Sequence, residues 1–260
     1  MAAAAEIAHG VFVVTAEMYT TTTTVVAGPG GGCLVIDPAV TAADLAALAA
    51  WLTARGLHPV AGWSTHPHWD HLLWSAALGP APRYTTPRAA AHAARTRPAL
   101  STELEHEAPG HDLALFARVE PLEGDQIDWP GPRAVVYPHD AHAPGHGAVF
   151  LPATGVLIAG DMCSDIEVPL LDLDAADPFG RYRAGLRLLA GVPGVRLVVP
   201  GHGQVADNRE FRRRVAADLA YLDAVEAGID IADPRLTDHW LRAEHAQALA
   251  CARMERKASD

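Results

Sequence analysis

The chain has 260 residues, half of them apolar, which is enough to bury a substantial core in one large domain. Twenty basic residues against 31 acidic ones give a net charge of −11, which argues against a nucleic-acid-binding surface. No apolar run approaches the roughly 20 residues of a membrane helix, and the cysteines are odd in number and widely spaced. We therefore expect a cytoplasmic protein with neither membrane nor nucleic acid as a partner.

The first third of the chain alternates strand-like and helix-like patterns. β-Branched and apolar runs predict strands at residues 11–14, 20–26 and 33–36, with the glycine-rich segment 28–32 as a hairpin turn. Thr41, followed by Asp44 and by leucines at helical spacing, predicts a helix that ends at Gly56. A strand at 60–65 completes a β-α-β unit, and a short helix is expected at 71–78.

Residues 79–130 are rich in proline, alanine and charged residues. We predict a loop at 98–110, and long loops in compact domains are commonly functional, so a substrate-covering segment is expected here. Helices are predicted on either side of it, at 87–97 and 113–119. The second half repeats the alternation, with strands at 134–137, 148–151, 156–159 and 197–199 and helices at 181–189, 207–227 and 237–256.

The segment from His66 to His71 reads His-Pro-His-Trp-Asp-His and follows a predicted strand. Histidines two apart on an extended backbone project to the same side, so His66 and His68 can share one metal. The turn that follows can direct Asp70 and His71 to a second metal. Imidazole and carboxylate suit zinc, and also iron or manganese. The alternative is a surface turn that carries three histidines by chance, which fits so compact a set poorly.

This motif, His66-x-His68-x-Asp70-His71, resembles the signature of the metallo-β-lactamase superfamily. Further segments resemble the other landmarks of that family in the expected order, over residues 11–205: residues 34–37 ending in Asp37, residues 141–145 around His142, Gly160-Asp161, and residues 200–203 around His202. The resemblance implies an α/β fold, a four-layer αββα sandwich of two mixed β-sheets flanked by helices. We expect a single domain over 1–260, with the C-terminal helices at about 207–256 packed on it or extending it.

The resemblance also implies a centre of two metal ions, most simply two zinc ions, with iron or manganese as alternatives. One ion would be held by His66, His68 and His142, the other by Asp70, His71 and His202, and Asp161 would bridge them. A hydroxide between the ions would attack the substrate, and Asp70 would orient it and carry a proton. Each of these ligand segments also follows a predicted strand, and strand ends at one edge of packed sheets converge.

Several neighbouring residues keep alternatives open. His142 is preferred to His146 as a ligand, which leaves His146 behind a ligand, facing substrate, or bonded to backbone at a strand end. Asp37 is expected to support a ligand, Trp69 either to wall the pocket or to pack in the core, and Trp74 to pack in the core. The acidic residues Glu167, Asp172 and Asp174 either line the entrance or face solvent, and solvent is the simpler expectation.

The implied function is metal-dependent hydrolysis of an ester, thioester, lactone or amide bond in a small-molecule substrate. A mononuclear-iron thiol or persulfide dioxygenase of the same fold is the main alternative, and it would use His66, His142 and Asp161. A nuclease is disfavoured by the acidic composition, and a non-catalytic metal-binding protein by the complete ligand set. No motif specifies the oligomeric state.

Overall fold

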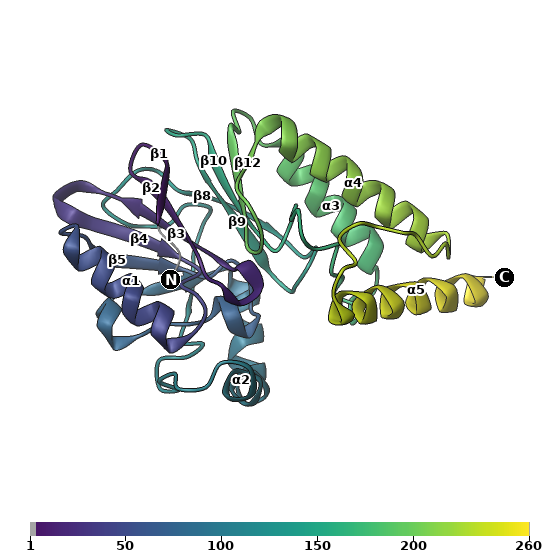
Figure 1. Cartoon of the computed structure of the whole chain (residues 1–260), viewed down its shortest axis with the longest axis horizontal. Helices are drawn as coiled ribbons and strands as arrows, with labels where there is room; N and C mark the ends of the chain where they lie inside the picture. The colour runs from purple at the N-terminus through teal and green to yellow at the C-terminus, as the bar shows by residue number, and fades with distance from the viewer. Residues whose placement is uncertain (1–3, 260) are drawn as a thin grey trace.

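The computed structural model describes residues 4–259 and folds into two β-sheets between helical layers (Figure 1). The first sheet has the strand order β1-β2-β3-β4-β5-β6-β7. Its strands are β1 (Ala5–Ala8), β2 (Val11–Thr15), β3 (Thr22–Ala27), β4 (Gly32–Ile36), β5 (His58–Trp63), β6 (Arg83–Thr85) and β7 (Glu120–Pro121). Strands β1 to β4 pair antiparallel, whereas β4 to β7 pair parallel, so the sheet is mixed.

The second sheet has the order β12-β11-β10-β9-β8 and is also mixed, since β10 and β11 pair parallel and the other pairs are antiparallel. Its strands are β8 (Val135–His139), β9 (His146–Leu151), β10 (Val156–Gly160), β11 (Leu197–Pro200) and β12 (Ala206–Asp207). The predicted strands therefore all form, with ends that shift by one or two residues.

Strand β4 shows how one sheet serves two cores. Side chains alternate along a strand, so Leu34 and Ile36 face the second sheet while Cys33 and Val35 face the helix α1 (Ala42–Ala54). The predicted Thr41 cap is present as a capping box with Asp44. The first sheet thus packs against the second on one face and against a helical layer on the other.

The other helical layer consists of α3 (Pro178–Gly191) and α4 (Asn208–Glu226), which cover the outer face of the second sheet, and α5 (His239–Ser259), which lies farther from the sheet (Figure 1). Helix α5 packs on α4 through Ala248, Leu249 and Ala252, and Tyr221 Oη lies 2.8 Å from His245 Nδ1. The four-layer αββα sandwich is thereby confirmed. None of the helices within residues 4–259 is long and apolar enough to span a membrane.

Three predictions in the middle of the chain are wrong. In the loop predicted at 98–110, residues 98–107 are helical instead, because α2 runs from Pro87 to Glu107 through Pro98. The helix expected at 71–78 is replaced by two single turns of 3₁₀ helix, Trp69–His71 and Ala76–Leu78. Residues 113–119 form turns instead of a helix, and their carbonyls accept hydrogen bonds from Arg83 and Arg97.

Candidate metal centre

The candidate ligands lie where strands end, at the edge at which the two sheets meet. His66 and His68 follow β5, Asp161 follows β10 directly, and His202 follows β11. The sheets are joined at this edge by the backbone, since Thr22 N donates to Gly201 O at 2.7 Å. Gly201 is required by close packing, because a Cβ atom there would lie 1.9 Å from Asp161 Oδ1.

The first cluster of donor atoms comes from His66, His68, His142 and Asp161, whose ligand atoms all lie within 4.8 Å of one another. His68 Nδ1 is 3.1 Å from His66 Nε2 and 3.0 Å from His142 Nε2. Asp161 Oδ2 is 3.3 Å from His66 Nε2 and 3.5 Å from His142 Nε2. Four atoms with lone pairs therefore point at one small volume.

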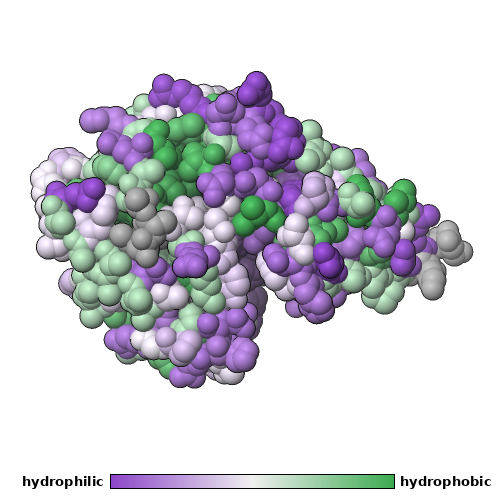
Figure 2. Space-filling view, in the orientation of Figure 1, coloured by the Kyte–Doolittle hydropathy of each residue, from purple (hydrophilic) through white to green (hydrophobic). Residues whose placement is uncertain are grey.

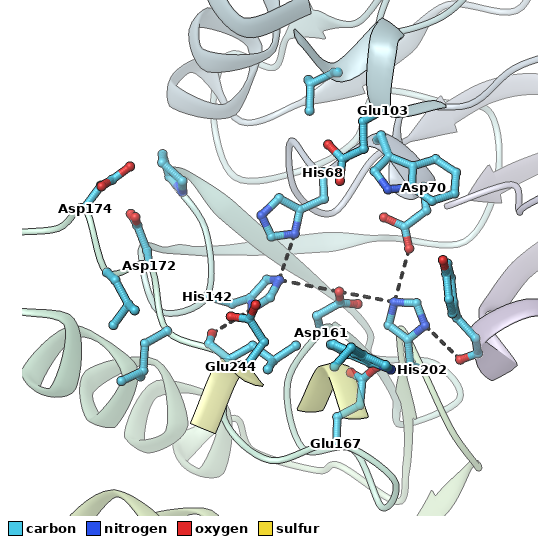
Figure 3. A pocket seen from close by; sticks show the side chains of 18 of the residues that line it. His68, Asp70, Glu103, His142, Asp161, Glu167, Asp172, Asp174, His202 and Glu244 are labelled. Carbon is cyan, nitrogen blue, oxygen red and sulfur yellow. Dashed lines mark hydrogen bonds and ion pairs between the residues drawn. The ribbon is translucent and has the colours of Figure 1, made fainter. Parts of the chain in front are cut away.

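The second cluster comes from Asp70, His71 and His202 and adjoins the first. His71 Nε2 is 3.4 Å from His202 Nε2 and 3.5 Å from Asp70 Oδ2. Asp161 reaches this cluster as well, because its Oδ1 is 3.2 Å from His71 Nε2 and its Oδ2 is 3.3 Å from His202 Nε2. Asp161 lies between the two clusters, as a bridging carboxylate would (Figure 3).

These donors fit divalent metal ions. Zinc–nitrogen bonds of 2.0–2.1 Å in a tetrahedron correspond to donor–donor distances of about 3.3 Å, close to the 3.0–3.5 Å measured here. Asp161 Oδ1 is buried and has no hydrogen-bond partner in the described residues, which a metal ion would supply. The residues present therefore suit the metals that the sequence predicts.

The outward-facing ring nitrogens are held by other groups, which fixes how the histidines point. His142 Nδ1 lies 2.9 Å from Leu170 O, and His202 Nδ1 lies 3.0 Å from Tyr19 O. His66 Nδ1 lies 3.0 Å from the hydroxyl of Thr65. A proton on Nδ1 in these rings leaves the Nε2 lone pair free toward the cluster, which is the tautomer that a metal ligand needs.

Burial and the carboxylates set the protonation of the centre. Burial lowers the pKa of His68 to about 3, and the neighbouring His142 acts in the same direction. Burial also opposes a charge on His71 and His202, but the Asp161 carboxylate holds the pKa of both rings well above its usual value. In return, despite burial, His71 and His202 keep the pKa of Asp161 well below its usual range. A bound divalent cation would supply the positive charge that protons on His71 and His202 otherwise provide beside Asp161.

Asp37 lies behind the centre. Its Oδ2 is 3.0 Å from His71 Nδ1, and the same atom accepts a hydrogen bond of 2.7 Å from the Thr65 hydroxyl, the group that contacts His66. Trp69 is buried, lines the pocket and makes an edge contact with the Tyr19 ring. Trp74 packs in the core, as predicted.

His146 does not face the pocket. Its ring stacks on that of His66 with a centroid distance of 4.8 Å, and its Nε2 lies 3.0 Å from Ala159 O. On its other side it stacks on His139 at 4.5 Å. Among the alternatives left open by the sequence, the structure therefore agrees with a strand-end histidine that contacts backbone. Its ring lies directly behind that of His66, a candidate ligand.

The centre opens into a pocket of about 800 Å³ between α2 and α5, where Figure 2 shows the surface hollowed between the two halves. Several residues that line this pocket could not be predicted from the sequence. Leu100, Glu103 and Glu107 come from the part of α2 expected to be a loop, and Trp240, Glu244 and Gln247 from α5. The expectation that Glu167 faces solvent is wrong, because this side chain is buried at the pocket wall.

Comparison with known proteins agrees with this fold and site. The family model of the metallo-β-lactamase superfamily matches residues 18–202. The chain is 31% identical over 191 residues to a hydroxyacylglutathione hydrolase from Ruegeria pomeroyi, with 74% of this chain and 67% of that protein covered. The chain therefore belongs to the metallo-β-lactamase superfamily.

Two solved structures extend the likeness. A β-lactamase domain protein from Burkholderia ambifaria superposes with a TM-score of 0.71 at 20% identity, covering 98% of this chain and 88% of that one. A protein described in a di-iron-bound form superposes with a TM-score of 0.60 at 26% identity, covering 78% of this chain and 98% of that one. The fold, the family and the His and Asp clusters together support a metal-dependent hydrolase.

Proposed function

We propose that this protein is a dinuclear metallohydrolase that cleaves an ester, thioester, lactone or amide bond of a small molecule. The observation that carries the proposal is the pair of adjoining donor clusters that share Asp161 at the base of one open pocket. A single-metal enzyme needs only the first cluster. The complete second cluster, Asp70, His71 and His202, favours two metal ions.

The two ions, when bound, would stabilise negative charge on the substrate oxygen and acidify a water to a pKa of about 7. The protein's own groups orient that chemistry. Asp70 lines the pocket and its Oδ2 lies 3.3 Å from His202 Nε2, so the carboxylate is in reach of both the second cluster and a bound substrate. We assign to Asp70 the orientation of the attacking water and the transfer of its proton to the leaving group.

Water is the proposed nucleophile because the pocket lacks the hydroxyl and thiol side chains that commonly form an acyl-enzyme. None of the described residues that line the pocket is Ser, Thr or Cys. Cys163 follows Asp161 by two residues, but it is buried in the core, and burial raises the pKa of its thiol well above the usual value. A covalent acyl-enzyme is therefore not expected.

The relatives favour hydrolysis. The name of the Ruegeria pomeroyi relative describes the hydrolysis of a glutathione thioester, and the 26%-identical structure holds two iron ions. We propose two zinc ions for this chain, with iron or manganese in their place if the protein is loaded with them.

The test is metal analysis of protein purified without added metal, together with hydrolysis of thioesters, esters, lactones and amides. Two divalent ions per chain with metal-dependent turnover of one of these classes would support the proposal. One iron per chain with thiol-dependent oxygen uptake would identify a dioxygenase instead. Fully loaded protein that turns over no compound of the panel would contradict the assignment as a hydrolase.

His68→Ala tests the first cluster directly. His68 Nδ1 lies within 3.1 Å of two other donor atoms, so its loss opens the ligand shell. We expect fewer than two metal ions per chain and a loss of kcat/KM of at least about 100-fold. His106→Ala is the matched control, because His106 is exposed on α2 and should change neither quantity. Full activity of His68→Ala would remove this residue from the centre.

A further inference from the structure

Carboxylates dominate the pocket that leads to the candidate metal centre. Beyond Asp70 and Asp161, six acidic side chains line it, and none of the described lining residues is Lys or Arg (Figure 3). They come from three separate parts of the chain: Glu103 and Glu107 from α2, Glu167, Asp172 and Asp174 from the segment after β10, and Glu244 from α5. Three elements thus supply the same charge to one cavity.

Glu167 distinguishes this arrangement from a set of solvated surface acids. Its side chain is only 7% exposed, yet among the side chains that the structure describes its carboxylate has no hydrogen-bond or ion-pair partner. By contrast, Glu107 accepts a hydrogen bond of 2.8 Å from the Tyr19 hydroxyl. An unpartnered buried carboxylate is costly, so a cationic ligand would recover that free energy.

Aromatic side chains stand at the mouth of the same pocket. Tyr19 and Trp240 line it and are 39% and 41% exposed, which is unusual for large hydrophobic residues. Trp240, Glu244 and Gln247 are spaced i, i+4, i+7 on α5, so one face of this helix turns an aromatic ring and a carboxylate toward the cavity. Aromatic faces beside carboxylates attract organic cations.

Bound metal ions would not reverse this charge. Two divalent ions would keep an excess of two positive charges after neutralisation by Asp70 and Asp161, and six carboxylates outnumber that excess. A cleft lined by charges of one sign raises the local concentration of ligands of the opposite sign. The pocket as a whole is therefore expected to repel anions.

From these observations we infer that the substrate carries a positive charge: it is an ester, thioester, lactone or amide with an ammonium group and an apolar part. This inference rests on the proposed hydrolase function. The cation would lie among Glu167, Asp172 and Glu244, while Trp69 and Leu170 contact the apolar part. A glutathione thioester, with two carboxylates and one ammonium group, would be disfavoured, unlike in the Ruegeria pomeroyi relative.

A matched substrate series tests the charge selection. Butyrylcholine and 3,3-dimethylbutyl butyrate have nearly the same shape and differ in one positive charge, and S-lactoylglutathione represents the anions. We expect kcat/KM for butyrylcholine to exceed that of the neutral ester by at least about 10-fold at low salt. Molar salt should reduce this preference. Equal turnover of the two esters, or a preference for the glutathione thioester, would overturn the inference while leaving the hydrolase function intact.

Substitutions test which carboxylates select the cationic substrate. Glu167→Gln and Asp172→Asn should each lower kcat/KM for butyrylcholine several-fold more than kcat/KM for the neutral ester, so that the ratio of the two falls. Asp172 is only partly buried, so its substitution keeps the test valid if Glu167→Gln disturbs His202 or the metal content. Glu123→Gln, an exposed carboxylate outside the pocket, is the matched control. An unchanged preference in both pocket variants would contradict the assignment of these residues.

A binding measurement separates the two proposals. Metal-loaded protein is titrated with hexyltrimethylammonium and with hexanesulfonate, which need no hydrolysis to be scored. At least about 10-fold tighter binding of the cation supports the inference even if no compound is hydrolysed, in which case only the hydrolase function fails. Equal binding, or tighter binding of the sulfonate, would overturn it.

Discussion

At the scale of single residues, Asp37 links two candidate ligands from behind. Its Oδ2 contacts His71 Nδ1 at 3.0 Å and the Thr65 hydroxyl at 2.7 Å, while Thr65 contacts His66. His66 and His71 belong to different donor clusters. One carboxylate that touches no metal position therefore orients one ring in each cluster.

We predict that Asp37→Asn lowers metal affinity about 10–100-fold, the usual effect of losing a carboxylate that orients a ligand. The neutral amide removes the negative charge that lies 3.0 Å from His71 Nδ1, although Asn tolerates the positive φ of 48° at this position. Competition with a metal chelator measures the change. Asp128→Asn, at an exposed site, is the control and should bind metal as the parent does. Unaltered affinity would show that His71 needs no help from Asp37.

The choice between His142 and His146 shows what the sequence could not supply. Both histidines lie beside Pro-Gly or Gly after a strand-like run, so their local patterns are alike. His146 is in fact the first residue of β9 and its ring lies between those of His66 and His139, whereas His142 lies in the preceding loop and reaches the cluster. The exact start of β9 decides which ring turns inward, and strand ends are set by pairing with β8 and β10.

At the scale of elements, α2 is the main failure of the sequence prediction. Its start was predictable, because Thr86 caps the helix and Pro87 occupies its first turn. Pro98 predicts that the helix ends before it, but the helix continues to Glu107. Tertiary contacts hold the helix on both sides of Pro98, since Arg97 Nε donates to Phe116 O at 3.0 Å before it and Leu104 is buried after it. Such contacts override local propensity and cannot be read from the local pattern.

Pro98→Ala should therefore stabilise the protein. An interior proline costs about 3 kcal/mol relative to alanine, of which about 1 kcal/mol is offset by its restriction of the unfolded chain. We expect the free energy of unfolding in urea to rise by about 2 kcal/mol. Pro109→Ala, in the loop after α2, is the matched control and should give no gain. A decrease in stability for Pro98→Ala would mean that α2 uses the proline as a required kink.

The dependence on tertiary contacts also explains why some residues of the pocket could not be predicted from the sequence. The strands and the His66 to His71 motif were predictable because period-two patterns and ligand spacing are local. Glu167 and Trp240 were not, because their contact with the pocket depends on how α2, α5 and the segment after β10 come together. The proposed ligands could thus be predicted from the sequence, whereas the residues proposed to select the substrate could not.

At the scale of the whole molecule, the candidate centre joins the two halves of the sandwich. His66, His68, Asp70 and His71 follow the first sheet, whereas His142, Asp161 and His202 belong to the half with the second sheet. A core of apolar side chains from both sheets lies beside the centre and includes Leu34, Trp63 and Val199. Metal binding should therefore stabilise the assembly of both halves, and we propose that the chain unfolds as a single domain.

Removal of the metal tests this proposal. Because only the folded chain brings the seven donors together, free metal at a thousand times its Kd should stabilise the protein by about 4 kcal/mol for each bound ion, or about 8 kcal/mol for two. A chelator should remove this stabilisation and lower the unfolding midpoint while leaving one cooperative transition, followed by tryptophan fluorescence and circular dichroism. His106→Ala should behave like the parent, whereas His68→Ala should respond much less to the chelator. Two separate transitions, only one of them metal-dependent, would show that the halves fold independently and that the ions do not hold them together.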